Sequence, residues 1–280
     1  MLDSFADMNM SQHIMAMQII KYHNHTMHSI DTIMPEMIKL RVQIAPLGFE
    51  IDRIVMPAIS MKADKVYLLR HDNYAEDMSG PYREKIIKKL EKKNIEVKVV
   101  DANRNRLFEI IKIVKDIIKD ERENDIYLNV GTGSKIHAVG CMMACMIFDD
   151  RTNFHPYYGE PKSYHSYKGS EQQTTGVKEI HKLPTYQIRT PHTKLLAALE
   201  IIRKAVRITK KQLAEIAEAH NLINIGARQE NMDQARYASL DKNIIHPLEH
   251  DWNFINVEKI GRNRYITMTE DGEHASEFLT

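Results

Sequence analysis

The stretch IYLNVGTGSKIHAVGCMMACMIF, residues 126–148, contains the pattern that decides the fold. A short apolar run is followed by the loop residues 131–135, Gly-Thr-Gly-Ser-Lys, and apolar residues then resume at the spacing of a helix. Glycines allow a backbone to approach a ligand closely, and the first amides of a helix point toward an anion. The stretch therefore predicts a strand, a tight loop and a helix whose start could bind phosphate.

Neither of two common phosphate loops fits these residues. The P-loop needs Gly-Lys followed by Ser or Thr, but Lys135 follows Ser134, and Ile136 offers no hydroxyl for Mg²⁺. The dinucleotide pattern needs a glycine at position 136, and the loop does not follow the first strand of its domain. These departures argue against a P-loop kinase or ATPase and against a Gly-x-Gly-x-x-Gly dinucleotide site.

Three further units of strand followed by helix precede this loop. The β-rich runs are residues 41–45, 65–70 and 95–100, and each is followed by a stretch with apolar residues at helical spacing. Alternating strands and helices predict an α/β domain, a Rossmann-like, doubly wound and mostly parallel sheet with helices on both faces. Residues 153–167 predict a less regular pair of strands at its edge.

Ligands bind to such sheets beyond the carboxyl ends of the strands, where the winding reverses. If the fourth strand neighbours the first, the loops 46–52 and 131–135 meet at that point, with residues 71–73, 101 and 103 on the rim. Lys135 at a helix start opposes the helix dipole, and a bound anion would offset this cost. The alternative is that both loops are ordinary strand-to-helix connections and that Lys135 is only solvated.

The last 89 residues have a different pattern. A polar segment, 169–191, predicts a linker with a possible bridging strand, and three helical patterns follow in 192–206, 209–220 and 232–250. Thr209 is a plausible N-cap, and we expect Leu195, Leu196, Leu199, Ile202, Leu213, Ile216 and Ala217 to face the core. Residues 254–269 predict a hairpin that turns at 261–263, so the segment indicates a winged helix-turn-helix domain.

In a winged helix the third helix enters the major groove and the hairpin touches phosphate or the minor groove. The residues expected to bind double-stranded DNA are Lys210, Lys211, Gln234, Arg236, Tyr237, Ser239, Lys242, Arg262 and Arg264. This domain is nearly balanced in charge and ends in the acidic stretch TEDGEHASEF. A role in dimerisation or protein contact therefore stays open as an alternative.

The whole chain of 280 residues has a formal charge of +1, which indicates no general bias toward nucleic acid or membrane. Cys141 and Cys145 lie inside an apolar run, so we expect packing in a reducing compartment and no metal site. No run of about 18 apolar residues and no leader pattern is present, which predicts a soluble cytoplasmic protein. Residues 1–36, rich in Met and His, are expected to be a helical or flexible extension.

Residues 41–55, RVQIAPLGFEIDRIV, and 127–140, YLNVGTGSKIHAVG, resemble the CRISPR-associated Rossmann-fold (CARF) domain. The resemblance is to archaeal CARF proteins that carry a C-terminal winged helix, and it covers about 38–164 and, less specifically, 192–279. Family members show an Asn-x-x-Gly-Gly-Thr-Lys-like turn after the fourth strand. Here Ser134 stands where threonine is usual, which keeps the hydroxyl, while the order of the glycines differs.

The resemblance implies a homodimeric transcription regulator whose paired sensor domains, 37–168, form one symmetric pocket for a cyclic oligoadenylate such as cyclic tetra-adenylate. Lys135 and the amides of Gly133 and Ser134 would hold phosphate, and residues 47–50 would line the base and ribose. The winged helices, 192–280, would bind DNA as a pair, and no further cofactor is expected. The ligand-binding residues expected in this way are Leu47, Gly48, Phe49, Glu50, His71, Asn73, Asn129, Gly131, Thr132, Gly133, Ser134 and Lys135.

Two alternatives stay open. Some CARF domains are similar to metal-independent ring nucleases, in which the 2′-hydroxyl of the ligand attacks the adjacent phosphate. Such an enzyme would use Ser134 and Lys135 as catalytic residues, with His71 or His137 as proton carriers. Alternatively, the same pair of domains would serve a regulator that answers to another nucleotide or metabolite.

Overall fold

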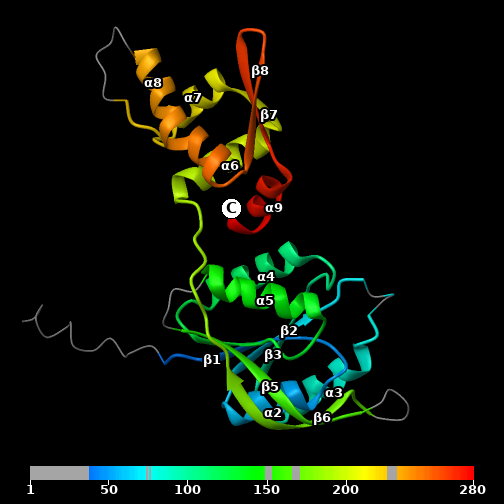
Figure 1. Cartoon of the computed structure of the whole chain (residues 1–280). Helices are drawn as coiled ribbons and strands as arrows, with labels where there is room; N and C mark the ends of the chain where they lie inside the picture. Colours follow the sequence, from blue (N-terminus) through cyan, green and yellow to red (C-terminus); the bar gives the residue numbers. More distant parts are fainter. Residues whose placement is uncertain (1–37, 74, 76, 149–152, 166–170, 226–231) are drawn as a thin grey trace, which may run out of the picture. The chain divides into compact units, whose positions relative to one another are not determined.

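A central sheet of six strands organises the first part of the chain (Figure 1). The structure is a computed structural model that describes residues 38–280 without 74, 76, 149–152, 166–170 and 226–231. The extension predicted at 1–36 lies outside the described residues. The first elements alternate as expected, in the order β1 (Arg41–Pro46), α2 (Asp52–Ser60), β2 (Lys65–Arg70), α3 (Gly80–Glu91), β3 (Glu96–Asp101), α4 (Leu107–Asp120), β4 (Asp125–Asn129) and α5 (Lys135–Phe148).

The sheet has the strand order β3-β2-β1-β4-β5-β6. Strands β1 to β5 are parallel to their neighbours, and β6 is antiparallel to β5. The predicted Rossmann-like, mostly parallel sheet is therefore confirmed, and β4 lies beside β1, which makes their shared edge the point where the winding reverses.

The edge of the sheet differs in detail from the expectation. Residues 153–167 contribute one long strand, β5 (Phe154–Tyr164), where a pair of strands was predicted. Its partner β6 (Thr174–Lys182) comes from the segment assigned to the linker, whose bridging strand is thus part of the sheet. The small polar and charged residues of β6 gave no clear apolar pattern of a strand, because an edge strand needs little apolar surface.

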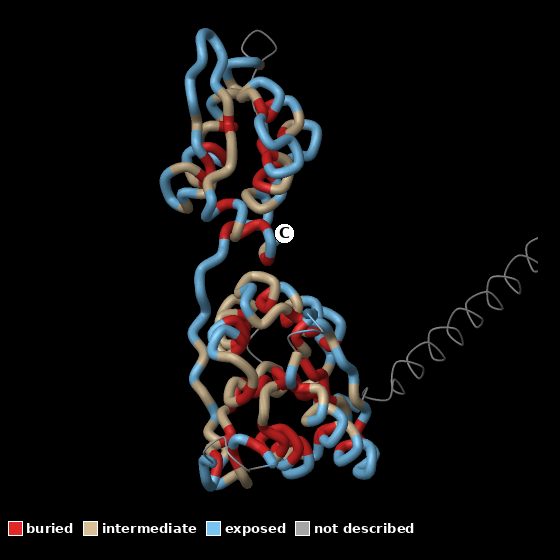
Figure 2. The backbone as a smooth tube through the Cα atoms, turned by 90° about the vertical axis from the view of Figure 1, so that its right-hand side faces the viewer, coloured by how far each residue is buried: buried red, intermediate tan, exposed pale blue. Residues whose placement is uncertain are grey.

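Two apolar clusters cover the two faces of the sheet. Val42 and Ile44 of β1 pack with α4 and α5, whereas Ala45 packs with α2 and α3. This division follows from the period of two along a strand, and it explains why the central strands are buried along their length (Figure 2). Cys141 and Cys145 are buried in the first cluster, and burial raises the pKa of the Cys141 thiol to about 12. Their expected packing role is confirmed.

The C-terminal part is a winged helix, as predicted. Its elements are α6 (Thr193–Ala205), β7 (Arg207–Thr209), α7 (Lys210–Ala219), α8 (Met232–Leu240), which continues in wider helical turns to Asp251, β8 (Ile255–Ile260), β9 (Asn263–Met268) and α9 (Glu270–Leu279). The strands form a small sheet of order β7-β9-β8.

Three details of this domain bear on the predictions. Thr209 caps α7 in a reciprocal arrangement with Gln212, so the predicted N-cap is confirmed. Leu199, Ile202, Leu213 and Ala217 are fully buried, while the side chains expected at 195, 196 and 216 are only half-buried. The acidic tail forms helix α9, which the sequence analysis did not predict. In the described part of the chain, no helix is both long and apolar enough to cross a bilayer.

Candidate functional site

The two glycine loops that follow β1 and β4 touch each other. A Cβ atom added to Gly48 would lie 3.0 Å from the amide nitrogen of Gly133. Gly133 has φ +77°, and a Cβ there would lie 2.6 Å from Cβ of Pro46. Both positions therefore require glycine, for close approach at residue 48 and for a left-handed backbone at residue 133. The structure brings together the two loops that the sequence analysis singled out.

A buried Glu–Arg pair lies beneath this contact. Oε1 of Glu50 is 3.6 Å from Nη1 of Arg53, and both side chains are less than one-tenth exposed. Burial raises the pKa of Glu50 above its ordinary value, and the positive charge of Arg53 opposes this shift. Arg53 is held by a bond of 2.8 Å from Nε to the carbonyl of Gly159 and lies 4.9 Å from the ring centre of Tyr158. Glu50 is one of the ligand-binding residues expected from the sequence, whereas Arg53 is not.

Asn129, fully buried at the end of β4, fixes the start of the second loop. Its Nδ2 donates to the carbonyl of Arg53 at 2.8 Å, and its Oδ1 accepts from the amide of Gly131 at 2.9 Å. A Cβ on Gly131 would lie 2.5 Å from Nη2 of Arg53, so the loop rests directly on the guanidinium. Asn129 therefore positions the loop from below.

The other side of the loop joins the ends of β2 and β3. The Ser134 hydroxyl accepts from the amide of His137 at 3.1 Å and lies 3.2 Å from both the carbonyl of Arg104 and Nδ1 of His137. The amide of Arg104 lies 3.3 Å from Nδ1 of His71. Burial, with the nearby charges of His71 and Arg104, lowers the pKa of His137 to about 4, so its imidazole is neutral near pH 7.

Lys135 is exposed at the first position of α5. Within the described part of the chain its ammonium has no ion-pair partner, and the positive end of the helix dipole lies beside it. Three other residues expected at the site have local roles. Leu47 is buried in the core, the ring of Phe49 packs on Tyr82 at 5.4 Å, and Asn73 accepts from the amide of Ala75 at 3.2 Å.

The start of helix α2 is not open to an anion. The amides of Ile51 and Asp52 donate to Oε1 of Gln172 at 2.8 and 3.0 Å, and Nε2 of Gln172 donates to Asp52 at 2.9 Å. Of the two loops, the second alone leaves its helix start open within the described residues, since Gln172 occupies the start of α2. No local signal could have revealed Gln172, which is 120 residues away along the chain.

Buried polar atoms without a hydrogen-bond partner gather around the two loops. Among the described residues, these atoms include Oε2 of Glu50, Nη2 of Arg53, Oγ1 of Thr132 and Nε2 of His137. Such atoms are rare in folded proteins, because each one costs about 1–3 kcal/mol. Their concentration here marks the edge between β1 and β4 as the candidate ligand site.

One group of metal-ligating side chains lies elsewhere, on β5 and β6. Oxygen or nitrogen atoms of Glu160, Glu179 and His181 lie within 4.8 Å of one another. The Lys178 ammonium is 2.9 Å from Glu160, and Nε2 of His181 is 2.9 Å from the same carboxylate. Because these ion pairs already satisfy Glu160, we assign no metal to this group.

The nine residues expected to bind DNA fall into two sets. Lys210 pairs with Asp241 at 2.6 Å, Arg236 pairs with Glu218 and Asp233, Ser239 donates to the carbonyl of Asn224, and Tyr237 packs against the core. The polar groups of Lys210, Arg236 and Ser239 are therefore already bonded within the domain, and Arg236 joins α8 to α7 through Glu218. The second set is exposed and comprises Lys211, Gln234, Lys242, Arg262 and Arg264.

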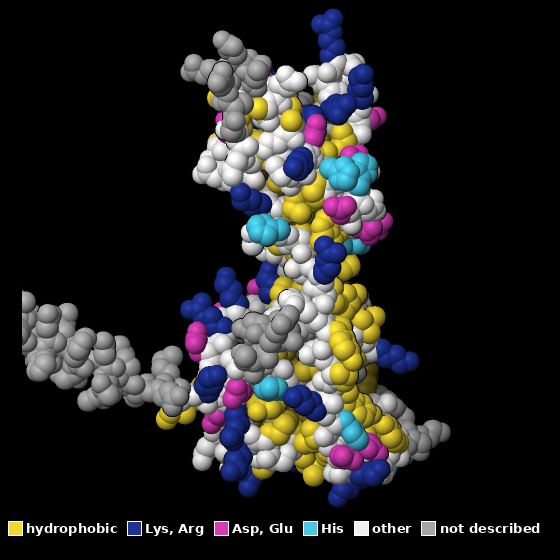
Figure 3. All heavy atoms as spheres, turned by 60° about the vertical axis from the view of Figure 1, so that its left-hand side comes forward, with side chains coloured by type: hydrophobic (Ala, Val, Ile, Leu, Met, Phe, Trp, Pro, Cys, Tyr) yellow, Lys and Arg dark blue, Asp and Glu magenta, His cyan; other side chains and the backbone are white. Residues whose placement is uncertain are grey.

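The hairpin carries the most prominent part of the exposed set. Lys259, which the sequence analysis did not name, is exposed on β8 next to Arg262 and Arg264. Figure 3 shows Lys and Arg side chains projecting at the top of the molecule, where Figure 1 has the β8–β9 turn. Gly261 at this turn has φ +60° and open space around it. The hairpin can thus present cations to a polyanion.

Fold and site together define a two-domain class, a Rossmann-like α/β domain followed by a winged helix. Residues 41–164 match the family model described as "HFX_2341_N:-like, N-terminal". Residues 192–280 match the model of the DUF6293 C-terminal winged helix domain. The order of the two models agrees with the resemblance to CARF proteins that end in a winged helix.

Individual relatives are more distant. The uncharacterized protein MJ1513 of Methanocaldococcus jannaschii is 29% identical over 194 residues, which cover 61% of this chain and 58% of that protein. The match thus spans less than three-fifths of the relative's length.

Two solved structures bear cyclic nucleotides. Csm6 of Enterococcus italicus, bound to cyclic hexa-2′-fluoro-hexa-dAMP, is 8% identical with a TM-score of 0.40 and coverages of 76% and 56% of the two chains. Can2 of Sulfobacillus thermosulfidooxidans, in complex with cyclic tetra-adenylate, is 13% identical with a TM-score of 0.35 and coverages of 84% and 63%. At these values neither similarity carries an argument about this chain.

Proposed function

We propose that the chain is a ligand-responsive transcription regulator of the cytoplasm, in which a CARF sensor domain binds a cyclic oligoadenylate and the winged helix binds double-stranded DNA. The observation that supports this most directly is the set of unpaired buried polar atoms around two touching glycine loops, beside the unpaired Lys135. A ligand with both phosphate and base edges would satisfy donors and acceptors of this kind.

The site divides into two chemical regions. Lys135 and the start of α5 offer positive charge at the surface, which suits a phosphate. Glu50, Arg53 and Thr132 offer a carboxyl, a guanidinium and a hydroxyl below the loops, which suit the hydrogen-bonding edge of a base.

A homodimer is part of the proposal. Ile136 and Val139, in the first turns of α5 after Lys135, are 39% and 48% exposed and form an apolar face beside the loop. A second copy covering this face would place two identical loops around one ligand. A cyclic molecule with repeated phosphates presents equal groups to such a pair, and the paired winged helices would match a palindromic DNA site.

The test is isothermal titration of the full chain with cyclic tetra-adenylate. We expect one ligand per two chains, at least about tenfold weaker binding for Lys135→Ala, and no change for Lys93→Ala, an exposed lysine in the turn after helix α3. Absence of binding by the wild-type protein would exclude the oligoadenylate assignment.

A second candidate function is cleavage of the ligand. It is favoured by one observation, the distance of 3.2 Å between Oγ of Ser134 and Nδ1 of the neutral His137. In such a ring nuclease the 2′-hydroxyl of the ligand would lose its proton and attack the adjacent phosphate, and the P–O5′ bond would break to leave a 2′,3′-cyclic phosphate and a protonated 5′-hydroxyl. Lys135 would offset the charge that develops on the phosphate. Chromatography of the ligand recovered from the titration separates the candidates, since linear products that vanish in Ser134→Ala would make the protein an enzyme.

A further inference from the structure

Helix α9 of the winged helix packs on helix α4 of the sensor domain. The ring of Phe108 stacks with His274, with centroids 4.5 Å apart and planes at 22°, and with Phe278, at 5.6 Å and 4°. Nζ of Lys115 donates to the carbonyls of Phe278 and Thr280 at 2.9 and 3.1 Å. The positive charge of Lys115 also interacts favourably with the negative end of the α9 dipole. The contact therefore combines stacked aromatic rings at Phe108 with hydrogen bonds from the charged Lys115.

The α4 side of this contact begins at the candidate ligand site. The segment before α4 is tied to the glycine loop through Arg104, whose carbonyl lies 3.2 Å from the Ser134 hydroxyl. The same residue contacts His71 through its amide. Helix α4 starts at Leu107, so Phe108 lies in its first turn, four residues after Arg104. A displacement of Arg104 by a ligand would thus act on the turn that carries Phe108.

The α9 side is fixed to the wing. The amide of Thr269 donates to the carbonyl of Phe254 at 3.0 Å, and its hydroxyl donates to the carbonyl of Asn253 at 2.7 Å. A Cβ on Gly272 would lie 2.1 Å from the carbonyl oxygen of Phe254, so the two backbones are in direct contact. Because Phe254 directly precedes β8, these contacts attach the start of helix α9 to the base of the hairpin.

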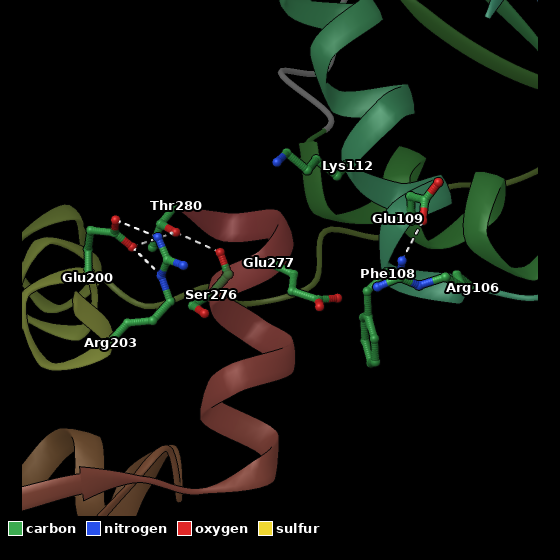
Figure 4. A pocket seen from close by; sticks show the side chains of 9 residues that line it. All are labelled: Arg106, Phe108, Glu109, Lys112, Glu200, Arg203, Ser276, Glu277 and Thr280. Carbon is green, nitrogen blue, oxygen red and sulfur yellow. Dashed lines mark hydrogen bonds and ion pairs between the residues drawn. The ribbon is translucent and has the colours of Figure 1, made fainter. Parts of the chain in front are cut away.

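Beside the contact between α4 and α9 there is space into which the helices can move. A cavity of about 320 Å³ lies beside it, lined by residues of α4, α6 and α9 (Figure 4). Lys112 and Glu277 line it from facing helices, and Figure 4 draws no interaction between them. Glu200 and Arg203 form an ion pair on the α6 wall. Phe278 is buried in the same apolar cluster as the residues of α4, so a shift of α4 is passed to α9 through this packing.

We infer that the Phe108 contact with His274 and Phe278 transmits ligand occupancy from the glycine loop to the DNA-binding hairpin. The inference rests on the proposed function for the identity of the signal, but the mechanical link is a property of this chain alone. In this link the ligand displaces the Ser134–Arg104 contact, helix α4 carries the displacement to Phe108, and α9 passes it to the hairpin.

The link is tested first without any ligand, by hydrogen exchange of the full chain followed by mass spectrometry. Ser134→Ala removes the hydroxyl beside the Arg104 carbonyl, and we expect exchange in residues 270–279 to rise about fivefold or more. In a Phe108→Ala background the same change is expected to have no further effect on these residues. Phe154→Ala, which removes a ring from the same apolar cluster at the start of β5, is the control and keeps the response.

His274→Ala removes one of the two α9 rings that stack on Phe108 and changes a half-buried side chain, so it replaces Phe108→Ala if that variant does not fold. Unchanged exchange in residues 270–279 for Ser134→Ala would overturn the inference. An equal response in the wild-type, Phe108→Ala and His274→Ala backgrounds would overturn it as well. Failure of cyclic tetra-adenylate to bind would instead refute the proposed function, and the exchange result would stand apart from it.

Discussion

At the scale of single residues, His137 should make the stability of the protein depend on pH. Its pKa is lowered from 6.5 to about 4 by burial, so the unfolded chain takes up a proton at a higher pH than the folded chain. The stabilisation is complete above about pH 6.5 and is lost as the pH falls toward 4, with a total of about 3 kcal/mol. Urea unfolding over this range should show the loss for the wild type and a flatter profile for His137→Gln.

The exposed His220 supplies the matched control for this measurement. His220→Gln should keep the wild-type pH profile. An identical profile for His137→Gln and the wild type would mean that the imidazole is not held neutral by its surroundings.

Two glycines with similar backbone conformations separate the effect of the loop contact on the unfolding free energy from the effect of the left-handed backbone. Gly133 and Gly261 have φ of +77° and +60°, but only Gly133 has close neighbours, including Pro46 and His137. Gly261→Ala should cost about 1 kcal/mol of unfolding free energy, since only the left-handed backbone is strained. Gly133→Ala should cost about 3 kcal/mol or more and also abolish ligand binding, because the added methyl group separates the two loops.

The residues of the candidate site differ in how well the sequence predicts them. Gly48, Gly133, Ser134 and Lys135 could be named because strand, loop and helix are consecutive and glycine has a known backbone role. Arg53 and Gln172 could not, because their partners are 106 and 120 residues away in the chain. Side-chain contacts over such separations depend on the order of strands in the sheet.

At the scale of elements, helix α7 depends on its cap. Oγ1 of Thr209 accepts from the amide of Gln212, and the Gln212 side chain accepts from the amide of Thr209. Thr209→Ala should lower the unfolding free energy by about 1 kcal/mol, measured by chemical denaturation. Thr193→Ala, at the exposed first turn of α6, should leave it nearly unchanged.

The hairpin should account for much of the salt dependence of DNA binding. Arg262 and Arg264 are exposed and have no ion-pair partner among the described residues. Each change to Ala should weaken binding to a random-sequence duplex and reduce the slope of log K against log salt by about 1. Arg122→Ala, at an exposed site of the sensor domain, is the control, and equal slopes for all four proteins would argue against contact of the hairpin with phosphate.

Element types were predictable where one periodicity dominated. The parallel strands and the helices of both domains follow from apolar patterns with periods of 2 and 3.6 residues. Helix α9 was missed although Thr269, followed by Glu270 and Asp271, is an N-cap signal with acidic residues in the first turn. The acidic composition of this segment indicated charge and not a packed helix. Ala275 and Phe278 are buried by packing that only the folded chain provides.

At the scale of the whole molecule, the two binding sites should be coupled reciprocally. If cyclic tetra-adenylate changes DNA affinity by some factor, DNA must change the affinity for the nucleotide by the same factor. Titrations in both directions, with fluorescence anisotropy for DNA and calorimetry for the nucleotide, should agree. A nucleotide that binds without changing DNA affinity would show that the domains act independently.

The sequence by itself determined the two domains, the mostly parallel sheet, the glycine loop at the end of β4 and the Thr209 cap of α7. These features are encoded locally, in periodicity, glycine placement and capping residues. Only the tertiary structure decided that Arg53 lies beneath the loops, that Gln172 fills the start of α2, that Arg236 is consumed by ion pairs and that α9 packs on α4. The physical reason is that each of these depends on which distant segments the sheet order and core packing bring into contact.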